Sequence, residues 1–228
     1  MIPQKQVTVL LAEDHAVVRQ GLCALLNTDG QFLVAGEART GREAVEMAAT
    51  LRPDVILMDI GMPELNGLEA TRQILTANPA AKIIILSAHS DDEYIKLTTA
   101  AGVMGFLEKQ TSAEILTKAV HEVALGKSFF SPSIAKRLRD EQDKPRDRNG
   151  MFKSSGSRLT SRESEVLQLV AEGQANKQVA ATLGISIKTV EKHRQHLMDK
   201  LNIHDTAGLT RYAISAGVIQ CSVQLTIV

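Results

Sequence analysis

The chain has 228 residues, of which 44% are hydrophobic, and its net charge is zero. This length is large for one domain and comfortable for two, and the composition is ordinary for a globular protein with a sizeable core. Cys23 and Cys221 are too few and too far apart for a disulfide framework or a metal knuckle, and both are expected to stay reduced. The N-terminus shows no signal-peptide pattern, and no apolar run approaches the roughly 18 residues of a membrane span, so we expect a cytoplasmic protein with no membrane contact.

Charge is unevenly distributed along the chain. Residues 1–125 carry 10 Lys/Arg and 16 Asp/Glu, a net charge of −6. Residues 126–157 carry 8 Lys/Arg and 4 Asp/Glu, a net charge of +4. Residues 158–228 carry 8 Lys/Arg and 6 Asp/Glu, a net charge of +2. An acidic front and a mildly basic back suggest a cation as partner of the first part and a polyanion as partner of the second.

Short apolar runs alternate with helical periodicities in the first part of the chain. Strands are predicted over residues 7–12, 32–38, 55–59, 82–86 and 103–107. Helices are predicted over residues 16–27, 41–51, 68–77, 92–101 and 112–125. Strands and helices in strict alternation predict an α/β fold with a doubly wound parallel sheet.

Polar residues stand at the carboxyl ends of four of these strands, namely Glu13, Asp14, Asp59, Ser87 and Lys109. Such ends share one edge of a parallel sheet, which is where ligands bind, so we expect these side chains to form one pocket. Each residue alone is more typical of a cap or a solvated surface, but four strand ends meeting by chance is much less frequent. Three carboxylates repel one another without a cation, oxygen ligands suit Mg²⁺, and a carboxylate beside Mg²⁺ can attack phosphorus.

This pattern resembles the receiver domain of two-component response regulators, a flavodoxin-like (βα)5 module. The residues that carry the resemblance are the acidic pair after the first strand, Asp59 within MDIGMP, and the polar residues after the fourth and fifth strands. The resemblance implies that Asp59 is the phosphoacceptor. It also implies that Mg²⁺ is held by Asp14, Asp59 and the backbone carbonyl of Gly61, with Glu13 binding through water.

The same resemblance assigns the residues that sense the phosphoryl group. Lys109 is implied to pair with it, Ser87 to hydrogen-bond it, and Phe106 to turn inward as the switch aromatic. Phe106 stands where the family often has Tyr, so no hydroxyl is available there. Gln110 follows Lys109 where many receivers have a cis-proline, which favours a trans peptide bond, since a non-proline cis bond costs roughly 3 kcal/mol.

The middle of the chain breaks this pattern. Arg137 to Ser157 is rich in charge, Gly and Ser, which is typical of a solvated linker, and its basic residues carry no specific signal for DNA. A short helix fits residues 131–139, with Ser131 as N-cap and Pro132 in the first turn. The expected organisation is a receiver domain over 1–125, a linker over 126–157, a DNA-binding domain over 158–221 and a C-terminal tail over 222–228.

Four short helices are predicted over residues 158–221. Thr160 and Glu163 form a capping box, and the later helices are expected to be capped by Asn176, Ser186 and Asp205. Gly184 supplies a tight turn between the second helix and a longer third one. This order is the helix-turn-helix signature and predicts an all-α domain.

The segment from Leu159 to Ile203 resembles the LuxR/FixJ-type DNA-binding domain through LT-x-RE, EG-xx-NK, TVE-x-H and KL. The resemblance implies that Glu191, Lys192 and Gln195 face bases. Residues implied to lie near phosphates are Lys177, Lys188, Thr189 and Arg194. Composition alone leaves a plain solvated surface helix open as an alternative.

Together the two halves resemble a NarL/FixJ-family response regulator. The resemblance implies that a sensor histidine kinase phosphorylates Asp59, and that this controls homodimerisation and sequence-specific binding of double-stranded promoter DNA to regulate transcription. Such a protein is not a conventional enzyme. A flavodoxin-like flavoprotein requires a Ser/Thr/Gly-rich loop where this chain has Glu13-Asp14-His15. A phosphatase of the haloacid dehalogenase type requires Asp at position 61, where this chain has Gly. An interaction module that never binds DNA is a third alternative, against which the intact recognition helix argues.

Overall fold

The computed structural model describes residues 6–28, 30–88, 92–142 and 159–219. The chain divides into two compact units, residues 1–149 and 150–228, and each is described by itself. The predicted domain boundaries near residues 157 and 221, and the predicted C-terminal tail, lie outside the described residues.

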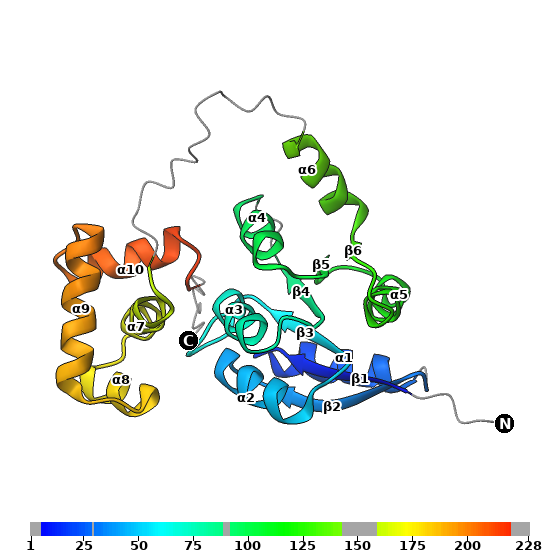
Figure 1. The fold of residues 1–228 in the computed structure, drawn as a ribbon, viewed down its shortest axis with the longest axis horizontal. Coiled ribbons are helices and arrows are strands. Elements are labelled where there is room, and N and C mark those ends of the chain that lie inside the picture. Colours follow the sequence, from blue (N-terminus) through cyan, green and yellow to red (C-terminus); the bar gives the residue numbers. More distant parts are fainter. Residues whose placement is uncertain (1–5, 29, 89–91, 143–158, 220–228) are drawn as a thin grey trace, which may run out of the picture. The chain divides into compact units, whose positions relative to one another are not determined.

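The first unit alternates strands and helices along the chain (Figure 1). Its first five strands are β1 (Val7–Ala12), β2 (Phe32–Ala38), β3 (Val55–Asp59), β4 (Ile83–Ser87) and β5 (Gly105–Glu108). The helices between and after them are α1 (Ala16–Thr28), α2 (Gly41–Leu51), α3 (Gly67–Ala77), α4 (Asp92–Ala101) and α5 (Ala113–Ala124). All ten predicted elements are therefore present, with ends displaced by at most two residues.

All strands of this unit pair in parallel, in the order β2-β1-β3-β4-β5-β6. In the centre of the sheet, Leu57 of β3 lies between Leu11 of β1 and Ile84 of β4. All five residues of β3 are buried because helices cover both faces of the sheet. The predicted doubly wound sheet is confirmed, and Asp59 is the last residue of its central strand.

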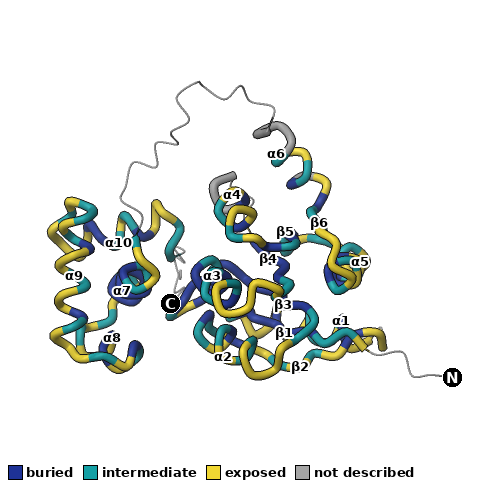
Figure 2. Tube along the Cα trace, in the orientation of Figure 1, coloured by how far each residue is buried: buried dark blue, intermediate teal, exposed yellow. Residues whose placement is uncertain are grey.

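Each face of the sheet has its own apolar core. On one face α1 and α5 pack on the strands, with Leu26 and Val120 completely buried. On the other face α2, α3 and α4 contribute Ala44, Ile74 and Ile95. Figure 2 shows the consequence, since the inner strands β1, β3, β4 and β5 are largely buried while the helices alternate buried and exposed positions.

One further strand and helix follow α5, within the predicted linker. β6 (Phe129–Phe130) pairs in parallel with β5, so that Phe130 lies opposite Phe106. α6 (Pro132–Gln142) confirms the predicted short helix, and its Ile134 is completely buried in the core on the α4 side of the sheet. Residues 129–138 therefore extend the sheet and the core of the first unit.

The second unit consists of the helices α7 (Ser161–Ala171), α8 (Asn176–Leu183), α9 (Ile187–Leu201) and α10 (Thr206–Ser215). The predicted capping box opens α7: Glu163 donates its backbone N–H to Thr160 Oγ1 at 3.3 Å, and Thr160 donates its own to Glu163 Oε2 at 2.8 Å. Gly184 ends α8 with φ of 63°, a left-handed conformation that glycine adopts easily. The predicted all-α four-helix unit is confirmed.

The cap of α8 differs from the prediction. Ala175 is the N-cap, and Asn176 is the first helical residue. The backbone N–H of Ala175 donates to Gln178 Oε1 at 2.9 Å. The side-chain oxygen of Asn176 instead accepts from Arg194 Nη1 at 2.8 Å, so this residue links α8 to α9 rather than capping α8.

A single apolar core holds the four helices together. Val190 and Leu197 are the completely buried residues that α9 contributes, and Leu209 and Ala213 come from α10. Within the described parts of both units, no helix has the length and apolar character needed to cross a membrane.

Candidate functional sites

The structure brings the predicted pocket residues to one edge of the sheet. β1, β3, β4 and β5 are neighbours and all run in the same direction, so their carboxyl ends meet there. Backbone hydrogen bonds fix the segments beyond these ends: Glu13 N–H donates to Ala38 at 3.0 Å, and Lys109 N–H donates to Ser87 at 2.8 Å. These bonds continue the hydrogen bonding of the sheet into the loops, and they hold the side chains of the loops over the carboxyl edge of the sheet.

Lys109 is the positive centre of the pocket. Its Nζ lies 3.0 Å from Asp59 Oδ2 and 2.8 Å from Glu13 Oε2. Asp59 and Glu13 are almost completely buried, at 2% and 0% exposure, so little water screens these ion pairs. A buried carboxylate pair with a single ammonium between its members is the core of the site.

The charges in the pocket are not balanced. Burial, and then the charge of Glu13, raise the pKa of Asp59 above its ordinary value, against the opposing effect of Lys109. Burial alone would lower the pKa of Lys109, but the nearby charges of Asp59 and Glu13 outweigh it, so the pKa of this ammonium is raised. The pocket therefore holds more negative charge than Lys109 neutralises.

The oxygen atoms of this pocket fit a divalent cation. Glu13, Asp14, His15 and Asp59 each offer one ligand atom, and these atoms lie within 4.8 Å of one another. Asp59 Oδ2 and Glu13 Oε2 are buried and, within the described chain, have no hydrogen bond of good geometry, although both face Lys109. Such carboxylate oxygens suit a hard cation, so the pocket is consistent with a metal-binding site.

Arg19 supports this pocket, although no motif in the sequence points to it. Its Nη1 donates to the backbone carbonyls of Glu13 at 2.8 Å and Asp14 at 3.2 Å, and its Nε donates to Glu37 Oε2 at 3.2 Å. The guanidinium, which has several donors in a fixed plane, thus holds the loop that carries the acidic pair. The sequence holds one hint of this role. Arg19 lies seven residues, or about two helical turns, before Leu26, so both fall on the same face of α1, and they are its buried residues.

The turn from β3 to α3 is packed tightly against the Asp59 backbone. Gly67 donates its N–H to Ile60 at 2.9 Å, and a Cβ atom on Gly67 would lie only 1.8 Å from the carbonyl oxygen of Asp59. Gly61, the predicted backbone ligand, is half-buried in the same turn. Only glycine at position 67 allows α3 to begin this close to Asp59.

Ser87 and Phe106, the predicted sensing pair, are both buried, at 4% and 0% exposure. Ser87 ends β4, and the ring of Phe106 belongs to the core that also contains Ile134 of α6. The peptide bond after Lys109 is trans, as predicted. Phe106 therefore lies between β4, which ends at Ser87, and β6, which leads into α6.

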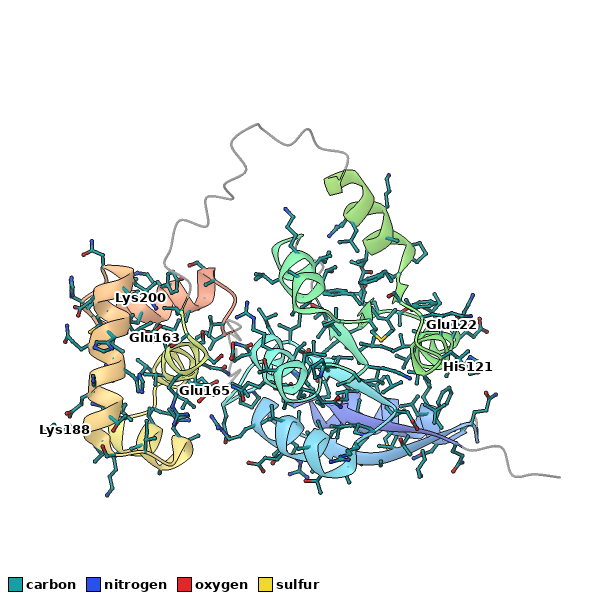
Figure 3. The ribbon with its side chains drawn as sticks, in the orientation of Figure 1. His121, Glu122, Glu163, Glu165, Lys188 and Lys200 are labelled. Carbon is teal, nitrogen blue, oxygen red and sulfur yellow. The ribbon has the colours of Figure 1, made fainter. Side chains whose placement is uncertain are left out.

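A second candidate site lies on α9. Glu191, Lys192 and Gln195, the predicted base-facing residues, are exposed and lie away from the buried Val190 and Leu197. Two of the four predicted phosphate-contacting residues are exposed as well, namely Lys177 and Lys188. Figure 3 shows Lys188 projecting outward near the start of α9.

The other two predicted phosphate contacts are engaged within the unit. Arg194 donates from Nη1 to Asn176 Oδ1 at 2.8 Å and from Nη2 to Thr206 Oγ1 at 3.1 Å, so it links α9 to α8 and α10. Thr189 Oγ1 lies 2.8 Å from the hydroxyl of the N-cap Ser186. Arg194 and Thr189 therefore help to fix α9 itself.

Ion pairs fix the other end of α9 relative to α7. Lys200 Nζ lies 2.8 Å from Glu163 Oε2, and Figure 3 shows these two side chains between the two helices. Burial would raise the pKa of Glu163, but hydrogen bonds from Lys200 and Thr160 outweigh it and lower the pKa. Arg162 pairs with Glu165 at 2.6 Å and also donates to the carbonyl of Leu183 at 2.9 Å, which ties α7 to the end of α8. These contacts thus hold α9 against α7 and hold α7 against the end of α8.

Comparisons with known families match both units. Residues 9–121 match the response regulator receiver domain. Residues 157–213 match the family described as bacterial regulatory proteins, luxR family. The first match contains the acidic pocket, and the second contains α7, α8, α9 and most of α10.

Known proteins and solved structures are similar to most or all of this chain. The transcriptional regulatory protein MctR of Rhizobium johnstonii is 35% identical over 219 residues, which cover 96% of this chain and 98% of that one. The response regulator protein VraR of Staphylococcus aureus is 35% identical over 214 residues, which cover 94% and 99%. Among solved structures, a two-component response regulator of the LuxR family from Aurantimonas sp. has a TM-score of 0.58 and 29% identity over 60% of this chain and 99% of that one. The structure of an RcsB–DNA complex has a TM-score of 0.56 and 26% identity, and the match covers 92% of this chain and 99% of that one.

These matches define the class of the protein. The chain is a response regulator with a LuxR-type DNA-binding domain, in a family of transcription factors rather than enzymes, and its receiver domain implies a kinase as partner. The flavoprotein and phosphatase alternatives are therefore wrong. On its acidic pocket, its α9 and these relatives, the chain belongs to the NarL/FixJ family of two-component response regulators.

Proposed function

We propose that a sensor histidine kinase transfers a phosphoryl group to Asp59, with Mg²⁺ in the acidic pocket, and that the phosphorylated chain regulates transcription in the cytoplasm as a homodimer on promoter DNA. The observation that carries the proposal is the buried Asp59 carboxylate with Lys109 Nζ 3.0 Å away. The Asp59 carboxylate has the Lys109 ammonium on one side, and the neighbouring carboxylates can hold a metal ion as a second cation. That is the arrangement phosphoryl transfer requires.

The pocket residues have distinct roles in the transfer. A carboxylate oxygen of Asp59 attacks phosphorus, the P–N bond to the kinase histidine breaks, and its imidazole leaves with the electron pair, so that an acyl phosphate forms. Lys109 neutralises charge on the phosphoryl oxygens. Mg²⁺ would be held by Asp14, Asp59 and the Gly61 carbonyl, with Glu13 acting through water, and would supply further positive charge beside the phosphoryl group.

The signal then leaves the pocket through β5 and β6. The hydroxyl of Ser87 bonds the phosphoryl group, and Phe106 adjusts to the new position of this loop. Phe130 is the ladder partner of Phe106, and Ser131 donates its backbone N–H to the carbonyl of Phe106 at 3.3 Å. A shift of Phe106 therefore acts on the segment that begins α6. Coupling of this kind typically amounts to about 1–3 kcal/mol.

On DNA, α9 is the recognition helix in the major groove. Glu191, Lys192 and Gln195 read base edges, and the phosphates are contacted by Lys177, Lys188, Thr189 and Arg194. The support from relatives is that one solved structure is an RcsB–DNA complex and another is described as two RcsB dimers bound to two parallel DNAs. Residues 158–228 have a net charge of only +2, so a monomer should bind DNA weakly. A dimer on two half-sites about one helical turn apart adds the missing affinity.

The first test is the intact mass of the full chain after incubation with acetyl phosphate, with and without Mg²⁺, beside an Asp59→Ala variant. The expected result is one phosphoryl adduct that requires both Mg²⁺ and Asp59. An adduct on the variant, or none on the folded wild type, would contradict the proposal. A gel-shift titration with promoter DNA at several salt concentrations then tests the second unit, and absence of DNA binding even at low salt would favour the pure interaction module.

A further inference from the structure

One side chain at the pocket is left without a role by the proposed function. His15 follows the acidic pair, and its side chain is 63% exposed at the mouth of the pocket. Its Nδ1 lies 2.7 Å from Asp14 Oδ1 and 3.0 Å from Glu13 Oε1. An imidazole nitrogen therefore faces the oxygen atoms that are available to a metal ion.

The backbone fixes His15 in this place. Its N–H donates to Glu13 Oε1 at 3.2 Å, and its carbonyl accepts from the N–H of Arg19 at 2.9 Å. Arg19 in turn holds the carbonyls of Glu13 and Asp14. The backbone of His15 is thus held just before α1 by contacts to Glu13 and Arg19, and Arg19 also holds the acidic pair.

The four ligand atoms lie close to the spacing of a mixed-donor metal site. One atom each from Glu13, Asp14, His15 and Asp59 lies within 4.8 Å of the others. Ligands about 2.1 Å from one ion lie at most about 4.2 Å apart, so an exposed imidazole needs only a small adjustment. A separate observation points to a cation: apart from their ion pairs with Lys109, the buried Asp59 Oδ2 and Glu13 Oε2 make no well-directed hydrogen bond within the described chain.

We propose that His15 is a metal ligand, and that with Glu13, Asp14 and Asp59 it gives this pocket a preference for divalent transition-metal ions such as Ni²⁺ or Zn²⁺ over Mg²⁺. The inference rests on the metal pocket of the proposed function and adds the imidazole to it. Mg²⁺ takes oxygen ligands, whereas imidazole suits Zn²⁺, Ni²⁺ and Cu²⁺. A transition ion bound through His15 competes with Mg²⁺ for the same carboxylates.

The test is titration calorimetry of the full chain, without a histidine tag, using Ni²⁺ and Mg²⁺ as separate probes. The variants are His15→Gln and, as a matched control, His121→Gln, whose imidazole is exposed on α5. His15→Gln should weaken Ni²⁺ binding roughly tenfold or more and leave Mg²⁺ binding nearly unchanged. His121→Gln should change neither. In competition, Ni²⁺ should displace Mg²⁺ from the wild type and do so less well from His15→Gln.

Two results would overturn the inference. One is Ni²⁺ affinity that His15→Gln leaves unchanged, which would make the imidazole a surface partner of Asp14 only. The other is an equal loss of Ni²⁺ and Mg²⁺ affinity, which would make His15 a support of the loop rather than a selective ligand. Either result with an intact Mg²⁺-dependent adduct on Asp59 leaves the proposed function standing. Loss of that adduct in the wild type is instead a failure of the proposed function.

Discussion

Gly67 begins α3 directly against Asp59, since a Cβ atom at position 67 would lie 1.8 Å from the Asp59 carbonyl oxygen. The contact is with backbone, which cannot turn away as a side chain does. The same turn carries Gly61 and ends the central strand of the sheet. A change at position 67 therefore acts on the proposed phosphoacceptor without altering any polar group.

Gly67→Ala should destabilise the first unit by about 1–3 kcal/mol, because the methyl group forces α3 away from β3. It should also reduce the yield of the Asp59 adduct with acetyl phosphate. Chemical denaturation and intact mass measure the two effects. Gly21→Ala is the control, since nothing lies within 4 Å of a Cβ there, and it should leave stability unchanged or raise it. Equal stability of Gly67→Ala and wild type would show that the turn adapts.

Asp59→Asn should stabilise the chain at neutral pH in a buffer without divalent cations. Burial and the charge of Glu13 raise the pKa of Asp59 in the folded state, so its neutral form is the one the fold prefers. Stability from this group is fully present below the unfolded pKa and is lost as pH rises through the folded pKa. The advantage of Asn over Asp should therefore grow as pH rises through that window and stay constant above it.

Thermal melts of both proteins across pH test this, with an expected rise in midpoint of roughly a few degrees at neutral pH. Mg²⁺ should stabilise the wild type and have little effect on Asp59→Asn. An advantage of Asn that is already complete at acid pH would mean that the Asp59 charge is not its cause.

Arg19→Met should weaken both the first unit and its affinity for Mg²⁺. The guanidinium donates to the carbonyls of Glu13 and Asp14 and pairs with Glu37, so its loss leaves acceptors without their donors, at a cost of about 2–3 kcal/mol. Metal affinity should fall roughly tenfold, because the acidic pair is no longer held in place. Calorimetry measures both, with Arg39→Met, an exposed position, as control. Unchanged Mg²⁺ affinity would limit Arg19 to a purely structural role.

The sequence predicts the carboxyl edge of the sheet well, for a physical reason. A buried strand is an unbroken apolar run, so the polar residue that ends it, such as Asp59 or Ser87, can be recognised from the sequence alone. Arg19 was missed because two of its three acceptors are backbone carbonyls, which leave no trace in a sequence pattern. β6 was missed because two residues are too few for any periodicity.

The second unit shows the same division between local and tertiary causes. The capping box of Thr160 and Glu163 is local and was predicted correctly. Asn176 was predicted as a cap from its type alone, but a residue eighteen positions away, Arg194, takes its side-chain oxygen. Local signals thus fix where helices begin and end, whereas contacts between helices decide what the polar side chains do.

Ile134→Ala should destabilise the first unit by about 2–4 kcal/mol, although residue 134 lies beyond the part that matches the receiver family. The side chain is completely buried in the core that contains Phe106. Hydrogen exchange resolved by peptide reports the two units separately and should show faster exchange in β5. Lys136→Ala, exposed on the same helix, is the control and should exchange as the wild type does. Unchanged exchange in β5 would show that α6 does not support the core.

Lys188→Ala and Arg194→Ala should weaken DNA binding in different ways. Lys188 is exposed near the start of α9, so its loss should leave stability unchanged and lower the salt dependence of binding by about one counterion. Arg194 joins α9 to Asn176 and Thr206, so its loss should destabilise the second unit by about 1–3 kcal/mol as well. Binding titrations at several salt concentrations, beside thermal melts, separate the two effects. Since a residue that only contacts phosphate would leave the melting temperature untouched, an unaltered melt for Arg194→Ala would contradict its role as a link between helices.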